Sequence, residues 1–143
     1  MELRYELMTS WMAKADHDYK AGWDEMQTAE PATDTVCFHM QQCVEKCLKA
    51  FLVVHESSFG ATHDIAELVE RCKVIDPAFD KLYALRAPSL TPYSIAAEIR
   101  EPPDFGEGEP GARVGREDYS FVFVRAQIFL RFARRVASVV AFD

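Results

Sequence analysis

The feature that most constrains this chain is the spacing of its apolar residues between positions 36 and 52. They recur at i, i+3, i+4 and i+7, which gathers them on one side of an α-helix. The residues are Val36, Cys37, Met40, Cys43, Val44, Cys47, Leu48, Phe51 and Leu52. The polar residues Gln41, Gln42, Glu45, Lys46 and Lys49 fall mainly on the other side. This pattern predicts an amphipathic helix with a solvated polar side, whose apolar side other helices must cover.

Helical spacing continues through most of the remaining sequence. The predicted helices cover about 9–28, 34–52, 62–73, 77–87 and 117–141, and residues 93–100 are compatible with about two further helical turns. Thr33 or Asp34 is predicted to cap the second helix and Thr62 the third, and Asp76 is followed by Pro77 in the usual order for a helix start. The fold class is therefore expected to be all-α, an up-and-down bundle of four to five helices formed by residues 1–143 as a single domain.

Two features near the end of the chain are relevant to binding. Residues 101–115 are acidic and rich in proline and glycine, which predicts a flexible loop within the domain. The last helix carries apolar residues on more than one side. A helix of that kind is either central in its bundle or contacts another subunit, so we expect a homodimer or a surface for a partner protein.

Charge and hydropathy limit the environments in which the protein can work. The chain has a net charge of −7, which argues against general binding to nucleic acid, although arginines gather between residues 113 and 135. Contact with RNA is therefore not favoured. No apolar run approaches the roughly 20 residues that a membrane span needs. The first residues lack the pattern of a secretory signal, so we expect a cytoplasmic protein without membrane contact.

The four cysteines are Cys37, Cys43, Cys47 and Cys72. His39, Cys43 and Cys47 share one side of the predicted helix and have the residue types of a zinc site. A zinc site usually contains paired short spacings such as Cys-x-x-Cys, and this chain has none. We therefore predict buried free thiols, with no metal and no cofactor.

Few polar residues suggest a binding site, and each also has a structural explanation. They are Lys46, Lys49, His63, Asp64, Tyr93 and Arg100. The two lysines are also explained by a solvated helix face, His63 and Asp64 by a helix start, and Arg100 by a surface ion pair. The chain contains no glycine-rich phosphate loop, nucleophile elbow or calcium loop, so no catalytic residue is assigned.

Three segments together resemble the HEPN domain family. They are Trp11-x-x-x-Ala15-x-x-Asp18, the run from His39 to Ala50 containing Gln-Gln-x-x-Glu-Lys-x-Leu-Lys-Ala, and Thr62-His63-Asp64-Ile65-x-x-Leu68. The family often has Arg-Tyr-Pro where this chain has Arg100-Glu101-Pro102, so the tyrosine differs. The similarity covers nearly the whole chain, and residues 41–50 are its most specific part.

The resemblance implies an all-α bundle, commonly dimeric and often encoded with a small nucleotidyltransferase of the MNT type in toxin–antitoxin-like pairs. Members are thought to bind nucleotides or to contact RNA. One branch consists of ribonuclease toxins with an arginine, four to six intervening residues and then a histidine. None of His17, His39, His55 and His63 has an arginine at that spacing. Because histidine is the usual base for metal-independent RNA cleavage, this disfavours a ribonuclease.

Three functional hypotheses follow from the resemblance. The first is a non-catalytic protein that binds a nucleotide, a nucleotidyltransferase partner or both. In it, Lys46, Lys49 and Arg100 neutralise phosphate with the help of the helix dipole near Asp64, His63 hydrogen-bonds the ligand and Tyr93 stacks on the base. The second is a divergent ribonuclease toxin. The third is a protein-interaction module without a small ligand.

Overall fold

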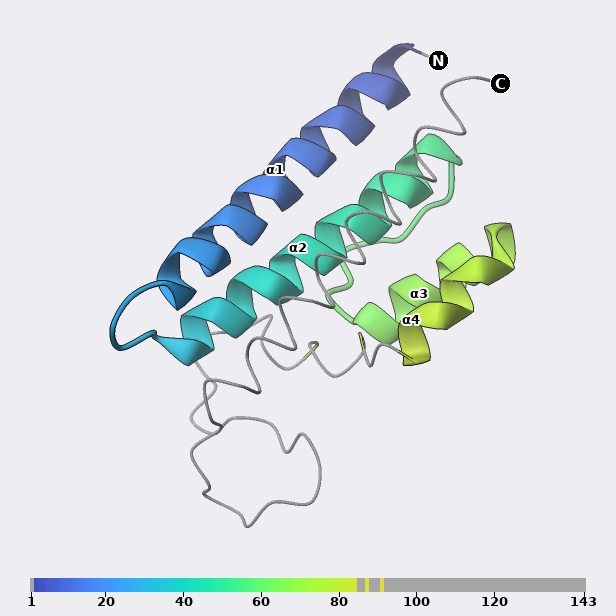
Figure 1. Cartoon of the computed structure of the whole chain (residues 1–143). Coiled ribbons are helices and arrows are strands. Elements are labelled where there is room, and N and C mark those ends of the chain that lie inside the picture. The colour runs from blue at the N-terminus through green and yellow to red at the C-terminus, as the bar shows by residue number, and fades with distance from the viewer. Residues whose placement is uncertain (1, 85–86, 88–90, 92–143) are drawn as a thin grey trace.

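The computed structural model describes residues 2–84, 87 and 91, and the described part is built from helices packed side by side (Figure 1). Its elements are α1 (Glu2–Met26), α2 (Thr33–Val54), α3 (Ile65–Ile75), the short 3₁₀ helix η1 (Pro77–Asp80) and α4 (Lys81–Ala84). Helices α1 and α2 run antiparallel, and α2 lies between α1 and the α3–α4 region. The all-α prediction is confirmed. The segment 93–100, the predicted helix at 117–141 and the predicted loop at 101–115 lie outside the described residues.

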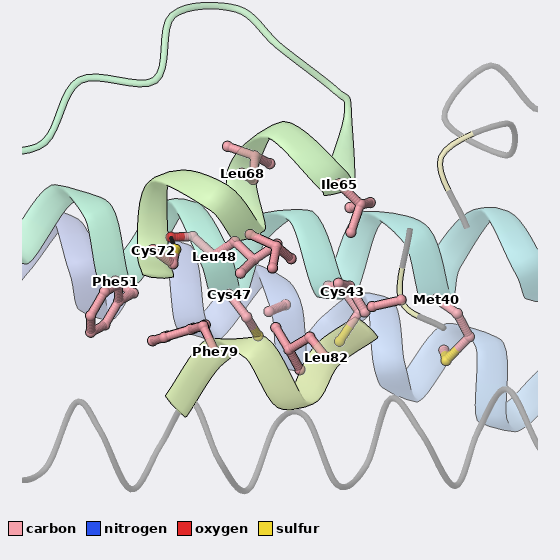
Figure 2. Close-up of a cluster of buried hydrophobic side chains, with 14 of the residues drawn as sticks. Met40, Cys43, Cys47, Leu48, Phe51, Ile65, Leu68, Cys72, Phe79 and Leu82 are labelled. Atoms are coloured by element: carbon pink, nitrogen blue, oxygen red, sulfur yellow. Dashed lines mark hydrogen bonds between the residues drawn. The ribbon is translucent and has the colours of Figure 1, made fainter. Parts of the chain in front are cut away.

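The core lies where α2 meets the elements around it. Side chains from α2, α3 and the η1–α4 segment interdigitate there, as Figure 2 shows. Fully buried members include Met40, Leu48, Leu52, Ile65, Leu68, Val69, Phe79 and Leu82. The apolar positions predicted on α2 are all buried, so the helical spacing identified this side of the core correctly.

The boundaries of two helices differ from the prediction. Helix α1 begins at Glu2 rather than near Thr9. Helix α3 begins at Ile65, and its N-cap is Asp64 rather than Thr62, because the Asp64 carboxylate accepts hydrogen bonds from the backbone N–H groups of Ala66 and Glu67. The residue before α2 is Ala32, which makes no side-chain cap, so Thr33 is the first helical residue instead of a cap.

The segment after α2 turns the chain sharply back toward α1. The Glu56 backbone has φ 57°, and the N–H of Ser57 donates to the carbonyl of Leu52 over 2.9 Å. A residue with positive φ directly after the C-cap, together with this bond, forms a Schellman motif. Glycine usually occupies that position, but here Glu56 does, and its carboxylate pairs with Arg4 at 2.6 Å. This ion pair connects the start of the 55–64 segment to α1.

The start predicted at Asp76-Pro77 is confirmed. The Asp76 carboxylate accepts from the N–H of Ala78, and Pro77 occupies the first position of η1.

Among the described helices, none is both long enough and apolar enough to cross a membrane.

The polar side of α2 is less solvated than predicted, because only Gln42 and Lys46 on it stay partly exposed. Gln41, Glu45 and Lys49 are all buried. Trp11 on α1 and Phe59 in the 55–64 segment contact this side, so α2 is covered on its polar side as well as on its apolar side. Helical spacing shows which residues share a side, but it does not show what packs on that side.

Candidate functional site

The buried carboxylate of Glu45 gathers three side chains into one network. Gln41 donates to Glu45 Oε2 over 2.9 Å, and Lys49 donates to Glu45 Oε1 over 2.7 Å. These contacts arise because residues four apart on a helix are neighbours. His63, which directly precedes the N-cap of α3, lies with Nδ1 at 3.0 Å from both carboxylate oxygens. We call Gln41, Glu45, Lys49 and His63 the Glu45 network.

The charge of Glu45 determines which nitrogen of the His63 ring carries the proton. Burial raises the pKa of the Glu45 carboxyl, but hydrogen bonds from Lys49, Gln41 and His63 lower it, and the net result is a pKa below the usual 4.5. An ionised carboxylate only accepts hydrogen bonds, so His63 Nδ1 must be the donor. When the ring is neutral its single proton therefore sits on Nδ1, and Nε2 carries a free lone pair.

The two ends of the network differ strongly in exposure. The side chains of Glu45 and Lys49 are only 5% and 6% exposed, whereas that of His63 is 61% exposed. Gln41 also donates to the backbone carbonyl of His63 over 3.4 Å. The buried members thus anchor both the main chain and the ring of an exposed histidine.

Lys49 is enclosed by aromatic rings as well as by its carboxylate. Its Nζ lies 5.9 Å from the centre of the Trp11 ring and 5.4 Å from that of Phe59. The two rings meet edge to face, with their centres 6.4 Å apart. Ring faces attract a cation, so Lys49 is satisfied entirely within the protein.

A second network joins α1 to α2. The Asp18 carboxylate on α1 accepts from Lys46 and lies 3.0 Å from His39 Nδ1. Lys46 and His39 are seven residues apart on α2, and Asp18 lies between them. The Asp18 side chain is 12% exposed, so this ion pair is also largely withdrawn from solvent.

The start of α3 offers no free N–H group to a ligand. Asp64 donates to Thr62 Oγ1 over 3.2 Å, Ile65 donates to Thr91 Oγ1 over 3.1 Å, and Ala66 and Glu67 donate to the Asp64 carboxylate. The first four N–H groups of a helix are the ones that bind anions. In α3 the protein itself occupies all four.

The residues predicted to bind a ligand therefore fall into three groups. Lys49 and His63 meet at Glu45. Lys46 belongs to the separate Asp18 network, and Asp64 is a helix cap. Tyr93 and Arg100 lie outside the described residues.

Sequence reasoning did not identify Glu45 and Asp18 as the organising carboxylates. A sequence signal exists for Glu45, since Gln41, Glu45 and Lys49 follow each other at intervals of four. Nothing comparable pairs Asp18 with Lys46, because that contact depends on how α1 lies against α2.

The cysteines form no ligand site in the described part of the chain. All four are buried and none of them forms a disulfide, as predicted. A hydrogen bond with Cys47 and burial raise the pKa of Cys43, and burial raises the pKa of Cys72 to about 12. His39 is directed to Asp18. Among the described residues, no group of three or more histidine, cysteine, aspartate or glutamate side chains could hold a metal ion.

Comparison with known families assigns the chain. The family model for the HEPN domain matches residues 8–136, nearly the whole sequence. The chain belongs to the HEPN domain family. Neither the curated proteins nor the solved structures yield a match to it. HEPN domains are all-helical, which agrees with the described helices, and the family suggests a nucleotide-related or ribonuclease-like function.

Proposed function

We propose that this HEPN-domain protein binds a nucleotide at the Glu45 network and does not cleave RNA. The observation that carries the proposal is the exposed His63 ring held by a buried carboxylate, with Nδ1 at 3.0 Å from Glu45. A histidine that only filled a surface position would not need a buried glutamate, glutamine and lysine to orient it. Ligand sites commonly place one such polar group beside apolar walls, and Trp11 and Phe59 lie next to this network.

The sequence supports the absence of ribonuclease activity. No histidine of the chain follows an arginine at the spacing of the family's ribonuclease branch. The two arginines on the described helices are engaged elsewhere, Arg4 with Glu56 and Arg71 with Glu67. Cellular RNA should therefore remain intact after strong expression of the protein. RNA degradation that is lost on substitution of a histidine would favour the divergent toxin instead.

A thermal-shift screen tests nucleotide binding. The purified protein is melted with nucleoside mono-, di- and triphosphates, and the screen is repeated with His63→Phe and with His17→Phe. A ligand at 100 times its Kd stabilises a fold by about 2.7 kcal/mol, which a melting scan resolves. We expect a shift that is clearly smaller in His63→Phe and kept in full in His17→Phe, because His17 is an exposed residue on α1 outside the network. No shift with any nucleotide would leave the protein-interaction module as the better description.

We also propose a protein partner, most simply the nucleotidyltransferase that the family resemblance implies, in a toxin–antitoxin-like or regulatory pair. Leu3 and Leu7 support this, because they are one turn apart on α1 and their exposed fractions are 76% and 47%. Co-expression with the neighbouring gene tests the idea. We expect a complex that survives gel filtration and is weakened by Leu3→Ser with Leu7→Ser. Light scattering of the chain alone tests the predicted homodimer.

A further inference from the structure

We propose that the His63 site recognises the nucleoside half of its ligand, through a hydrogen-bond donor, and not the phosphate. The donor is an N–H group of the base or a hydroxyl of the ribose. This inference rests on the proposed function, that a nucleotide binds at the Glu45 network. It changes the expected roles of the lysines, which the sequence assigned to phosphate.

The lysines near the site are already neutralised. Lys49 donates to Glu45 over 2.7 Å and is almost completely buried. Lys46 donates to Asp18, and both side chains are largely buried. A phosphate at either lysine would have to share the ammonium with a largely buried carboxylate, whose negative charge already neutralises it and repels a second anion. Neither lysine is therefore available as a phosphate anchor.

The helix dipole of α3 is not available to a phosphate either. Its first four N–H groups, counted from the N-cap, all donate within the protein, two of them to the Asp64 carboxylate. Asp64 directly follows His63 in the chain and places a negative charge where an anion would have to approach. A neutral or electropositive group is therefore preferred beside His63.

Among the described residues of the site, the polar group left for a ligand is the second nitrogen of the His63 ring. With Nδ1 donating to Glu45, Nε2 of the neutral ring is an acceptor. No described residue donates a hydrogen bond to it, and the ring is mostly exposed. An acceptor of fixed orientation selects a donor on the ligand. A nucleotide offers the exocyclic amines and ring N–H groups of its base and the hydroxyls of its ribose.

The experiment compares nucleosides with nucleotides on the full chain. Dissociation constants are measured by calorimetry for adenosine, cytidine, guanosine and uridine and for their 5′-monophosphates. We expect each nucleoside to bind within about threefold of its monophosphate, since the described site adds no phosphate contact. Uridine lacks an exocyclic amine and 3-methyluridine also lacks the ring N–H, whereas 2′,3′-dideoxyadenosine lacks the 2′- and 3′-hydroxyls. Whichever donor is used, its absence should weaken binding about five- to tenfold, as expected for one neutral hydrogen bond.

A substitution at His63 separates recognition from folding. In His63→Asn the amide N–H can still donate to Glu45, but the acceptor at Nε2 is gone. We expect an unchanged melting temperature together with the same five- to tenfold weakening, roughly one hydrogen bond, for the ligand that bound best. Nitrogen NMR of the free protein should also find the His63 proton on Nδ1.

Two results would overturn the inference. Monophosphates that bind far more tightly than their nucleosides would place the decisive contact at phosphate and leave nucleotide binding itself intact. Full affinity in His63→Asn would show that Nε2 makes no contact. If neither nucleosides nor nucleotides bind, the proposed function fails as well, so the two failures can be distinguished.

Discussion

Replacing Glu45 with glutamine should destabilise the fold substantially, although the side chain keeps its size. The carboxylate is 5% exposed, and its main partner Lys49 is 6% exposed. Removing one charge leaves the Lys49 ammonium buried without its counter-ion, a change that typically costs about 3–5 kcal/mol. The glutamine oxygen can still accept from Lys49, and the rings of Trp11 and Phe59 remain, so we expect the lower end of that range.

The assay is thermal unfolding followed by circular dichroism. For a domain of this size about 3 kcal/mol corresponds to a fall in Tm of roughly 6–12 °C. Glu70→Gln is the matched control, because Glu70 pairs with Lys73 at 3.2 Å but is 59% exposed. It should shift the Tm far less, since exposed ion pairs contribute little. Glu45→Gln combined with Lys49→Met removes both charges and should recover most of the loss.

The pH dependence provides a second check on Glu45. Its pKa in the folded state lies below 4.5, the usual value in the unfolded chain. The unfolded state therefore binds the proton more readily, and the ionised group stabilises the fold above pH 4.5. This contribution is lost as the pH falls through the folded pKa, and Glu45→Gln should lack that part of the acid transition. A Tm for Glu45→Gln equal to that of the unchanged protein would refute the view that the pair is isolated from water.

Three further predictions concern the core, the thiols and the start of α3. Phe79→Ala should lower the free energy of unfolding by about 3–5 kcal/mol in denaturant titration, because Phe79 is 1% exposed. Val74→Ala, at an 87% exposed site, should change it by no more than about 0.5 kcal/mol. Equal effects of the two substitutions would contradict the described core. Cys72, with its pKa raised to about 12, should resist Ellman's reagent at mildly alkaline pH until the protein is unfolded, and rapid labelling of the folded protein would contradict its burial. Asp64→Ala should lose about 1 kcal/mol of stability through the lost N-cap, while Asp64→Asn should retain most of it, and a neutral alanine variant would refute the cap.

The sequence alone was sufficient to predict the class of the fold and one side of its core. The spacing of apolar residues on α2 identifies those that are buried. An apolar stripe on a helix is buried regardless of which element packs against it. The Asp76-Pro77 start of η1 was equally predictable, since a cap bonds only to the residues that follow it. The family resemblance, carried by residues 41–50 above all, agrees with the family assignment.

Only the tertiary structure decided what the polar residues do. Lysine is a residue type that usually contacts solvent, yet α1 and the 55–64 segment bury Lys49 against Trp11 and Phe59. His63 lies eighteen residues from Glu45 and Lys46 twenty-eight residues from Asp18, so no local pattern could pair them. Helical periodicity shows in which direction a side chain leaves the axis of its helix. Whether a charged side chain is buried, and which group it pairs with, depends on where the other helices lie. That is why Lys46 and Lys49 were predicted to contact solvent or phosphate, whereas in the structure both pair with carboxylates inside the protein.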